Sequence, residues 1–277
     1  MNYRHAYHAG NFADVVKHVV LVLCLDYLRR KDAGFRVIDA HAGAGLYDLS
    51  GVEAQKTGEW EKGVGRLASL SGAPADLRLY LDAVEADLRQ GRYPGSPLIA
   101  ARGLRAQDRL HANELHGETC ATLRDVLADF AGVRVTQMDA YEALRAHLPP
   151  PERRGLALID PPFEDKREFD ILTRQMDEWK KRWATGTYLV WYPIKATSPI
   201  EPLKQAAAEL NMPRSWCLEA MIRPRTHALT FNGCGLILFN APYTVPERIE
   251  ALAPVLQGAL ALRSLQCTPL VADQPVR

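Results

Sequence analysis

The sequence predicts an α/β protein of the Rossmann-like kind, with a mostly parallel sheet covered by helices. Short apolar runs bounded by turn residues predict strands buried on both faces, and amphipathic helical segments separate them along the chain. An acidic residue directly follows or ends three of these runs. The 277 residues suffice for one large domain, or for one domain with an insertion.

The apolar run from Gly155 to Ile159 is the central strand of this prediction. It ends at Asp160, which two prolines and then Phe163 follow. Prolines lack an N–H group, so the strand must stop there, and Asp160 lies where open α/β sheets bind ligands. Asp160 can accept a hydrogen bond from an exocyclic amino group, with the Asp160 and Pro161 carbonyls as second acceptors, while Phe163 stacks on the base. Taken alone, a strand that ends in an acid-capped Pro-Pro turn explains these residues equally well.

The N-terminal segment, residues 1–11, is polar, aromatic and basic, and a helix with Asp14 as its N-cap is expected to run from there to Arg30. Seven aromatic or basic residues gather in this stretch: Tyr3, Arg4, His5, Tyr7, His8, Lys17 and His18. Such a strip can stack bases and contact phosphates; the alternative is a solvated lysine and a histidine at a helix boundary. A zinc site is not supported, because no acid or cysteine lies at ligand spacing.

A second candidate strand, residues 35–41, runs into the glycine loop Ala42-Gly43-Ala44-Gly45. Glycines let the backbone approach a ligand closely. The loop departs from the Gly-x-Gly-x-x-Gly pattern of dehydrogenases, because Asp48 stands where the third glycine is needed. It looks more like the acid-x-x-x-Gly-x-Gly loop with which methyltransferases wrap the methionine part of their cofactor. His41 would point at that cofactor, unless it simply faces solvent.

The next stretch breaks the alternation of strand and helix. Residues 50–93 carry many glycines and charges, and Pro74 to Gln90 predicts an amphipathic helix. A crossover helix that simply connects two parallel strands needs far fewer residues. We therefore interpret residues 50–93 as an inserted helical subdomain with Trp60 in its core. A turn at residues 93–97 follows, with Ser96 as the N-cap of a helix. Ser96 either only caps this helix or also lies near a ligand.

Two more predicted strands lead to acids. The strand at residues 110–115 carries Glu114 at its end, where an acid can accept hydrogen bonds from both hydroxyls of a ribose. The strand at residues 132–137 is followed by Asp139 and Ala140, where a carboxylate and a backbone N–H can meet an adenine ring. Together with Asp160, three acids mark three strand ends in chain order. Three such acids together with the glycine loop are more than chance would give, and they indicate a cofactor site.

The C-terminal part continues the alternation. We expect helices at residues 167–183, 200–210 and 245–262, and strands at 186–193, 216–222 and 235–239, the last two as a hairpin with the antiparallel strand. The loop between these two strands carries Arg223, Arg225 and His227, which either meet phosphates or are solvated. The polar, proline-containing tail, residues 264–277, is expected to be loose.

Composition limits the partners. The 34 basic and 33 acidic residues give a net charge of +1, so a nucleic-acid surface must be a local patch. The five cysteines are scattered without Cys-x-x-Cys spacing, as expected in a reducing compartment. The start of the chain lacks a signal-peptide pattern, and the longest apolar run, Val19 to Leu25, is too short to span a bilayer. We therefore expect a cytoplasmic protein, with neither a membrane nor a metal as partner.

Four blocks carry a resemblance to a known family: Tyr3 to His18, Asp39 to Gly45, Tyr93 to Pro97, and Asp160 to Glu164. The last block resembles the Asp-Pro-Pro-Tyr/Phe motif of amino-group methyltransferases, and together the blocks resemble the ribosomal RNA large-subunit methyltransferase J family. The resemblance implies methylation of an adenine N6 in 23S rRNA, with S-adenosylmethionine as cofactor. It also implies a class I methyltransferase fold, with a mostly parallel seven-stranded sheet, one antiparallel strand and an inserted helical subdomain.

The resemblance further implies a division of the chain and a set of site residues. Residues 1–49 and 94–263 would form the methyltransferase core, with residues 1–13 on the substrate side, 50–93 as the insertion and 264–277 as the tail. Asp160 would be catalytic, and Tyr3 and Lys17 would contact the substrate beside Phe163. The residues implied at the cofactor are His18, His41, Ser96, Glu114, Asp139, Ala140 and Asp160. We expect a monomer.

Three alternatives remain open at this point. A DNA adenine or cytosine methyltransferase would share the motif at Asp160, but no region resembles a separate sequence-reading domain. A non-catalytic RNA-binding protein on the same fold would not need intact acids at Glu114 and Asp160. A nucleotide-dependent dehydrogenase is disfavoured by the glycine loop.

Overall fold

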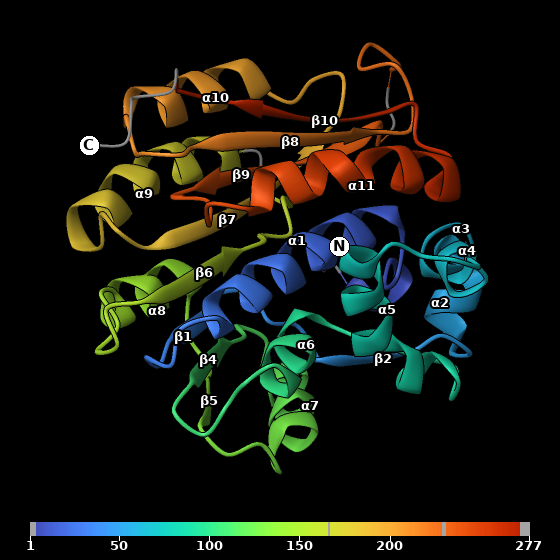
Figure 1. Ribbon diagram of the computed structural model, residues 1–277, viewed down its shortest axis with the longest axis horizontal. Coiled ribbons are helices and arrows are strands. Elements are labelled where there is room, and N and C mark those ends of the chain that lie inside the picture. Colours follow the sequence, from blue (N-terminus) through green and yellow to red (C-terminus); the bar gives the residue numbers. More distant parts are fainter. Residues whose placement is uncertain (1–3, 166, 229–230, 272–277) are drawn as a thin grey trace.

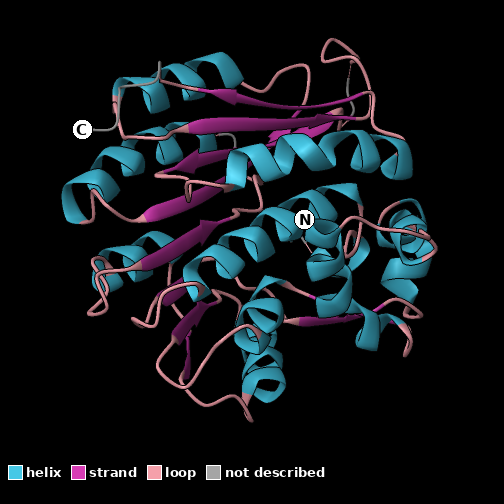
Figure 2. Ribbon diagram, in the orientation of Figure 1, coloured by secondary structure: helices cyan, strands magenta, loops and turns pink. Residues whose placement is uncertain are grey.

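An eight-stranded sheet with helices on both faces forms the centre of the molecule (Figures 1 and 2). The structure is a computed structural model that describes residues 4–165, 167–228 and 231–271. Across the sheet the strands follow the order β10-β8-β9-β7-β6-β1-β4-β5. Their bounds are β1 (Arg36–Asp39), β4 (Arg109–Asn113), β5 (Val133–Thr136), β6 (Gly155–Ile159), β7 (Thr187–Ile194), β8 (Trp216–Met221), β9 (Gly233–Phe239) and β10 (Ser264–Pro269).

The helices form a layer on each face of this sheet. Their bounds are η1 (His5–Tyr7), α1 (Phe12–Arg29), α2 (Val52–Thr57), α3 (Glu59–Lys62), α4 (Val64–Ala68), α5 (Ala75–Leu88), α6 (Ser96–Arg102), α7 (Gly117–Leu127), α8 (Ala140–His147), α9 (Glu168–Arg182), α10 (Ile200–Glu209) and α11 (Val245–Leu260). Alternate residues of β6 enter two separate cores. Leu156 and Leu158 belong to the core with α1, α5, α6, α7 and α11, whereas Ala157 and Ile159 belong to the core with α8, α9 and α10.

Strands β1, β4, β5, β6 and β7 are parallel to one another, so their carboxyl ends meet at one edge of the sheet. All residues of β6 are buried, as expected for a strand inside a parallel sheet. Strand β9 runs antiparallel to both β7 and β8, which confirms the predicted hairpin. The mostly parallel sheet is confirmed, but β10 is a second antiparallel strand in addition to β9, where one was predicted.

The prediction of a loose tail is wrong for residues 264–269. They form β10, which pairs antiparallel with β8 at the edge of the sheet, so the sheet has eight strands rather than seven. Leu265 is 5% exposed and joins the core that includes α11, with Cys267 packed against the same core. Polarity and prolines suggested a loop, but the alternation of Leu265 and Cys267 with exposed residues is that of an edge strand.

The segment after β1 packs against the start of the chain. Strands β2 (Leu46–Asp48) and β3 (Arg92–Pro94) form a small antiparallel sheet, and α2 to α5 lie between them in sequence. Strand β3 therefore replaces the first part of the predicted turn at residues 93–97. A Cβ on Gly63 would lie 2.1 Å from the carbonyl oxygen of Gly10, which shows how closely the two segments approach. The division into a core and an inserted subdomain remains a prediction.

The first long helix begins earlier than predicted. Helix α1 starts at Phe12, and the side chain of Asn11, not that of Asp14, caps it by accepting hydrogen bonds from the N–H groups of Ala13 and Asp14. Asp14 lies in the first turn and is 2% exposed. A buried acid needs compensating partners, and those of Asp14 lie in the candidate site.

Candidate active site

The carboxyl ends of the parallel strands open into a cavity of about 960 Å³. Its wall includes residues from α1, from the loops after β1, β4, β5 and β6, and from β7. Every predicted site residue that the structure describes lies on this wall: Lys17, His18, His41, Ser96, Glu114, Asp139, Ala140, Asp160 and Phe163. Tyr3 lies outside the described residues.

The glycine loop after β1 is fixed by close contacts. Gly43 has a φ of +64°, and a Cβ there would lie 2.2 Å from the hydroxyl of Tyr47. That hydroxyl accepts a hydrogen bond from the N–H of Ala44 at 3.2 Å. Glu114 accepts one hydrogen bond from the N–H of Gly43 at 3.0 Å and another from the N–H of His116 at 2.8 Å. The acid predicted to bind a ribose therefore also holds the loop in place.

Asn113 was not among the predicted site residues, yet it ties three strand ends together. Its amide donates to the carbonyls of Ala40 at 3.2 Å and Met138 at 3.0 Å, and its oxygen accepts from the hydroxyl of Thr136 at 2.9 Å. In the sequence, the available indication was a polar residue inside a predicted strand. The structure shows that its side chain is fully buried. Asp139, at the next strand end, caps α8 through one carboxylate oxygen.

Ser96 is not the N-cap of α6, because the helix begins at Ser96 itself, with Gly95 in the cap position. The hydroxyl of Ser96 instead donates to Oδ2 of Asp39 at 2.6 Å. Burial raises the pKa of Asp39 to about 6, although the hydrogen bond from Ser96 opposes this. Oδ1 of Asp39 is buried and has no hydrogen-bond partner among the described residues, so it can accept one from a ligand.

Burial keeps two histidines of the wall neutral. It lowers the pKa of His18 to about 3 and that of His41 to about 4. Nδ1 of His18 shares a 2.8 Å hydrogen bond with the hydroxyl of Tyr93, while Nε2 is buried without a partner in the described part of the chain. Nδ1 of His41 accepts a 3.3 Å hydrogen bond from the N–H of Asp160. His41 thus supports the backbone of Asp160, and His18 keeps one nitrogen available.

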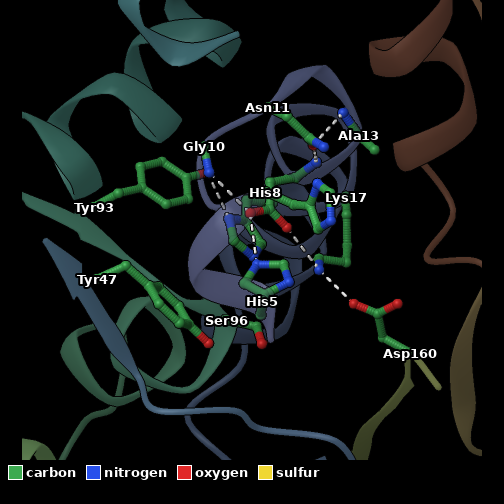
Figure 3. Close-up of polar contacts among 12 residues, drawn as sticks. His5, His8, Gly10, Asn11, Ala13, Lys17, Tyr47, Tyr93, Ser96 and Asp160 are labelled. Atoms are coloured by element: carbon green, nitrogen blue, oxygen red, sulfur yellow. Dashed lines mark hydrogen bonds and ion pairs between the residues drawn. The ribbon is translucent and has the colours of Figure 1, made fainter. Parts of the chain in front are cut away.

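A series of charged side chains links α1 to the acid after β6 (Figure 3). Nζ of Lys17 lies 2.9 Å from Oδ1 of Asp14 and forms a second ion pair with Asp160. Oδ2 of Asp14 accepts from the N–H of Gly10 at 3.0 Å and lies 2.8 Å from Nε2 of His5. Burial works against the charge of Lys17, but the charges of Asp14 and then Asp160 outweigh it and hold the pKa of Lys17 well above its usual value.

The aromatic-basic strip is engaged with acids of the protein itself. Beyond the pairs of Asp14, Nδ1 of His8 lies 3.0 Å from Glu59, which also accepts from the side chain of Asn11 at 3.0 Å. In the C-terminal loop, Arg225 pairs with Glu219 rather than standing free in solvent. The strip therefore holds the N-terminal segment in place, and its contact with phosphates stays a prediction.

Phe163 lies on the wall just beyond the prolines. Its φ of +51° is uncommon for a residue with a side chain, so the surroundings must hold it. The ring packs 4.9 Å from the ring of Phe169 and edge-on to Trp191 at 5.9 Å. The Pro-Pro turn and these rings together set the position of an aromatic surface beside Asp160.

The observed environment of Asp14 differs most from the one that the sequence predicted. Its position before an apolar helical stretch indicated an N-cap, whereas it is a buried acid with three partners. The spacing of Asp14 and Lys17 by three positions on a helix was the available signal, because such pairs lie side by side.

Residues 4–165, 167–228 and 231–271 contain neither a metal-ligand cluster nor a membrane-spanning helix. Among the described residues, no three His, Cys, Asp or Glu side chains gather as metal ligands. In the same part of the chain, no helix is both long and apolar enough to cross a membrane. The five cysteines are free thiols.

The wall fits S-adenosylmethionine, a ligand with amino, carboxylate, ribose and adenine groups. The glycine loop lines the cavity through Gly43 and Ala44, and the buried atoms Nε2 of His18 and Oδ1 of Asp39 have no hydrogen-bond partner in the described residues. Carboxylates mark the ends of β4 and β5, where the ribose and the adenine are expected. The fold and this wall together define a Rossmann-like methyltransferase that uses S-adenosylmethionine.

Comparison with known proteins identifies the family. The model of the family described as Ribosomal RNA large subunit methyltransferase D, RlmJ, matches residues 32–267. The protein named Ribosomal RNA large subunit methyltransferase J in Haemophilus influenzae is 37% identical over 264 residues, 94% of each chain. Its namesake in Escherichia coli is 36% identical over 263 residues, again 94% of each chain.

A crystal structure of a Legionella pneumophila protein agrees with this chain at a TM-score of 0.85 and 32% identity, covering 94% of this chain and 97% of that one. The similarity to these relatives extends along most of the chain. This chain therefore belongs to the RlmJ family of ribosomal RNA large subunit methyltransferases.

Proposed function

We propose that this protein transfers the methyl group of S-adenosylmethionine to N6 of an adenine in 23S rRNA. The observation that carries the proposal is the place of Asp160. It lies at the carboxyl end of a buried strand, before two prolines, on the wall of the cavity that the glycine loop also lines. Membership of the RlmJ family supports ribosomal RNA as the substrate.

When bound, S-adenosylmethionine would supply a methyl carbon on a positively charged sulfur, and the carbon–sulfur bond would break as the new carbon–nitrogen bond forms, leaving a neutral thioether. We assign Glu114 to the ribose hydroxyls, and Asp139 with the N–H of Ala140 to the adenine of the cofactor. The remaining contacts are assigned to residues around the glycine loop: His18, His41 and Ser96. Each of these residues lies on the wall of the cavity.

Asp160 prepares the target nitrogen. Its carboxylate accepts a hydrogen bond from the amino group, and the carbonyl of Asp160 or Pro161 accepts a second one. Two acceptors draw the nitrogen lone pair out of conjugation with the ring, which makes it a nucleophile. The nitrogen loses one proton as the methyl is transferred, and Asp160 is the group placed to take it. Lys17 is held protonated by its partners, so it cannot be that base.

Positioning supplies most of the acceleration in this scheme. The adenine must leave its stack to reach the cavity, because a stacked base cannot be approached by the methyl group. Phe163 offers it an aromatic face, and Tyr3 and Lys17 are assigned to the same substrate side. We further propose that the enzyme acts as a monomer in the cytoplasm.

The test uses labelled S-adenosylmethionine with two substrates: deproteinised 23S rRNA from cells that lack the protein, and duplex DNA. We expect label in the rRNA alone, recovered as N6-methyladenosine at a defined position. Methylation of the duplex would instead favour a DNA methyltransferase. Binding of rRNA without turnover would favour a non-catalytic RNA-binding protein.

A further inference from the structure

Lys17 creates an electrostatic problem for the proposed reaction. Its side chain is 6% exposed and its ammonium group touches Asp160, the acid assigned above to the nitrogen that receives the methyl group. The donor carries a positive charge on sulfur, whereas the product thioether is neutral. With Asp160 as its only acidic partner, this ammonium group would cancel the negative charge that Asp160 offers to a cationic donor. The preference for the donor over the neutral product would then be lost, since charges interact strongly where water is excluded.

We propose that Asp14 solves this problem: it positions Lys17 against Asp160 and offsets the charge of Lys17, so that the cavity favours the cationic donor. The proposal rests on the proposed function, because it assumes that the donor's sulfur lies near Asp160. Asp14 is not assigned to contact the substrate or the donor. It acts through Lys17 and is a positioning residue.

The geometry gives Asp14 little freedom. One oxygen lies 2.9 Å from Nζ of Lys17, and the other is held by the N–H of Gly10 at 3.0 Å and lies beside His5. Its side chain is 2% exposed, so water screens the Asp14–Lys17 pair poorly. Two carboxylates and one ammonium group leave this cluster with one negative charge, which a donor cation can balance.

Other ionisable groups also interact with Lys17, so a change in their protonation must not be mistaken for the effect of Asp14. Asp39 on β1, Asp160 after β6, Cys234 on β9 and the histidines 18 and 41 all interact electrostatically with it. His5 lies on the far side of Asp14, and its protonation would add one positive charge. The measurements below are therefore made at both pH 7 and pH 9. We expect each variant to change the ratio of the two dissociation constants in the same direction at both pH values.

The experiment is isothermal titration of the full-length protein with S-adenosylmethionine and with S-adenosylhomocysteine, which differ by one methyl group and one positive charge. The readout is the ratio of the two dissociation constants. Asp14→Asn keeps the size and removes the charge, and we expect the preference for the cation to fall by roughly tenfold. The double variant Asp14→Asn, Lys17→Met removes both charges and is expected to restore the ratio to within about twofold of wild type.

A purely structural role of Asp14 would behave differently. It would weaken both ligands alike, and the double variant would be no better than the single one. Glu59→Gln is the matched control, because Glu59 also holds the N-terminal segment, through His8 and Asn11, but no contact joins it to Lys17 in the described structure. We expect this control to leave the ratio unchanged, and thermal unfolding reports whether each variant is folded.

The proposal is overturned if Asp14→Asn leaves the ratio within twofold of wild type, or if the double variant fails to restore it. If Asp14→Asn does not fold, Lys17→Met is compared with wild type, and a reduced preference for the cation in that variant would overturn the proposal. The assay contains no RNA. A failure to methylate 23S rRNA would contradict the proposed function and leave this readout intact.

Discussion

The two ends of the cavity are built in different ways. At the donor end, acids at strand ends bind nearby backbone, as Glu114 does with the N–H groups of Gly43 and His116. At the other end, Lys17 and Asp160 are 143 positions apart and meet only through their side chains, with Asp14 behind them. The end that we assign to the donor is therefore defined by strand topology, whereas the end that we assign to the substrate depends on a balance of buried charges.

This difference predicts how variants should divide. Changes at the substrate end should act on turnover, because they disturb the charges around the reacting nitrogen. Changes at the donor end should act on cofactor affinity, because they remove contacts that are made before and during the reaction alike.

The largest effect is expected for Asp160→Ala. Loss of the acceptor that prepares the amino group should reduce kcat by roughly a thousandfold or more, as for other groups that act on the transition state. Affinity for the cationic donor should fall far less, by about tenfold, because one negative charge of the Asp14–Lys17–Asp160 cluster is lost. The measurement is methyl transfer to 23S rRNA beside isothermal titration with the donor; turnover near the wild-type rate would remove Asp160 from the mechanism.

A smaller loss is expected for Lys17→Ala and for Tyr3→Ala, roughly tenfold to a hundredfold in kcat. Both residues are assigned to the substrate side, so the donor dissociation constant should change less than kcat. Single-turnover rates and donor titrations separate the two quantities. Should donor affinity fall more than turnover, both residues would have to be reassigned to the donor end.

Glu114→Gln tests the donor end itself. The variant keeps the shape but weakens acceptance from the ribose hydroxyls and from the N–H of Gly43, so donor affinity should fall by about tenfold. At saturating donor, kcat should stay within about threefold of wild type if binding is uniform. A collapse of kcat at saturating donor would contradict the division between the two ends.

The smallest effect concerns stability against pH. His18 and His41 are neutral in the folded protein, with pKa values of about 3 and about 4, whereas a histidine in the unfolded chain has its ordinary pKa of 6.5. The unfolded chain thus binds more protons between these values, so stability is complete above about pH 6.5 and is lost as the pH falls toward 4. We expect a loss of roughly 1 kcal/mol per histidine for each pH unit in this window.

Asp39 opposes this trend, because a pKa raised to about 6 lets the folded protein hold a proton that the unfolded chain has lost. Burial also lowers the pKa of His111 to about 3, so three histidines against this one acid leave a net loss on acidification. Urea unfolding at pH 7.5 and pH 5 measures it, and His18→Gln should reduce the dependence. Stability that is flat or rises on acidification would show that these histidines are protonated in the folded state.

Sequence reasoning predicted that the strand ends gather around one cavity, and the reason is local. Strand β1 before a glycine loop, Glu114 at the end of β4 and Asp139 after β5 follow from apolar runs and what comes directly after them, and the cavity wall includes all of these positions. The carboxyl ends of parallel strands meet at one edge, so a pattern along the chain becomes a cluster in space.

Contacts between distant segments could not be predicted in the same way. No pattern along the chain indicates that Lys17 pairs with Asp160, that Ser96 donates to Asp39, or that His8 meets Glu59, because each pair depends on packing between distant segments. The same limit applies to β10. Its pairing with β8 becomes visible only when the edge of the sheet is known.

The central claim is that the donor and an extruded adenine meet beside Asp160. The most direct test is a crystal structure of the protein with S-adenosylmethionine bound. The account predicts a sulfonium methyl that faces the carboxylate of Asp160, with the ribose against Glu114 and the methionine part along the glycine loop. A donor bound elsewhere, or one whose methyl points away from Asp160, would contradict it.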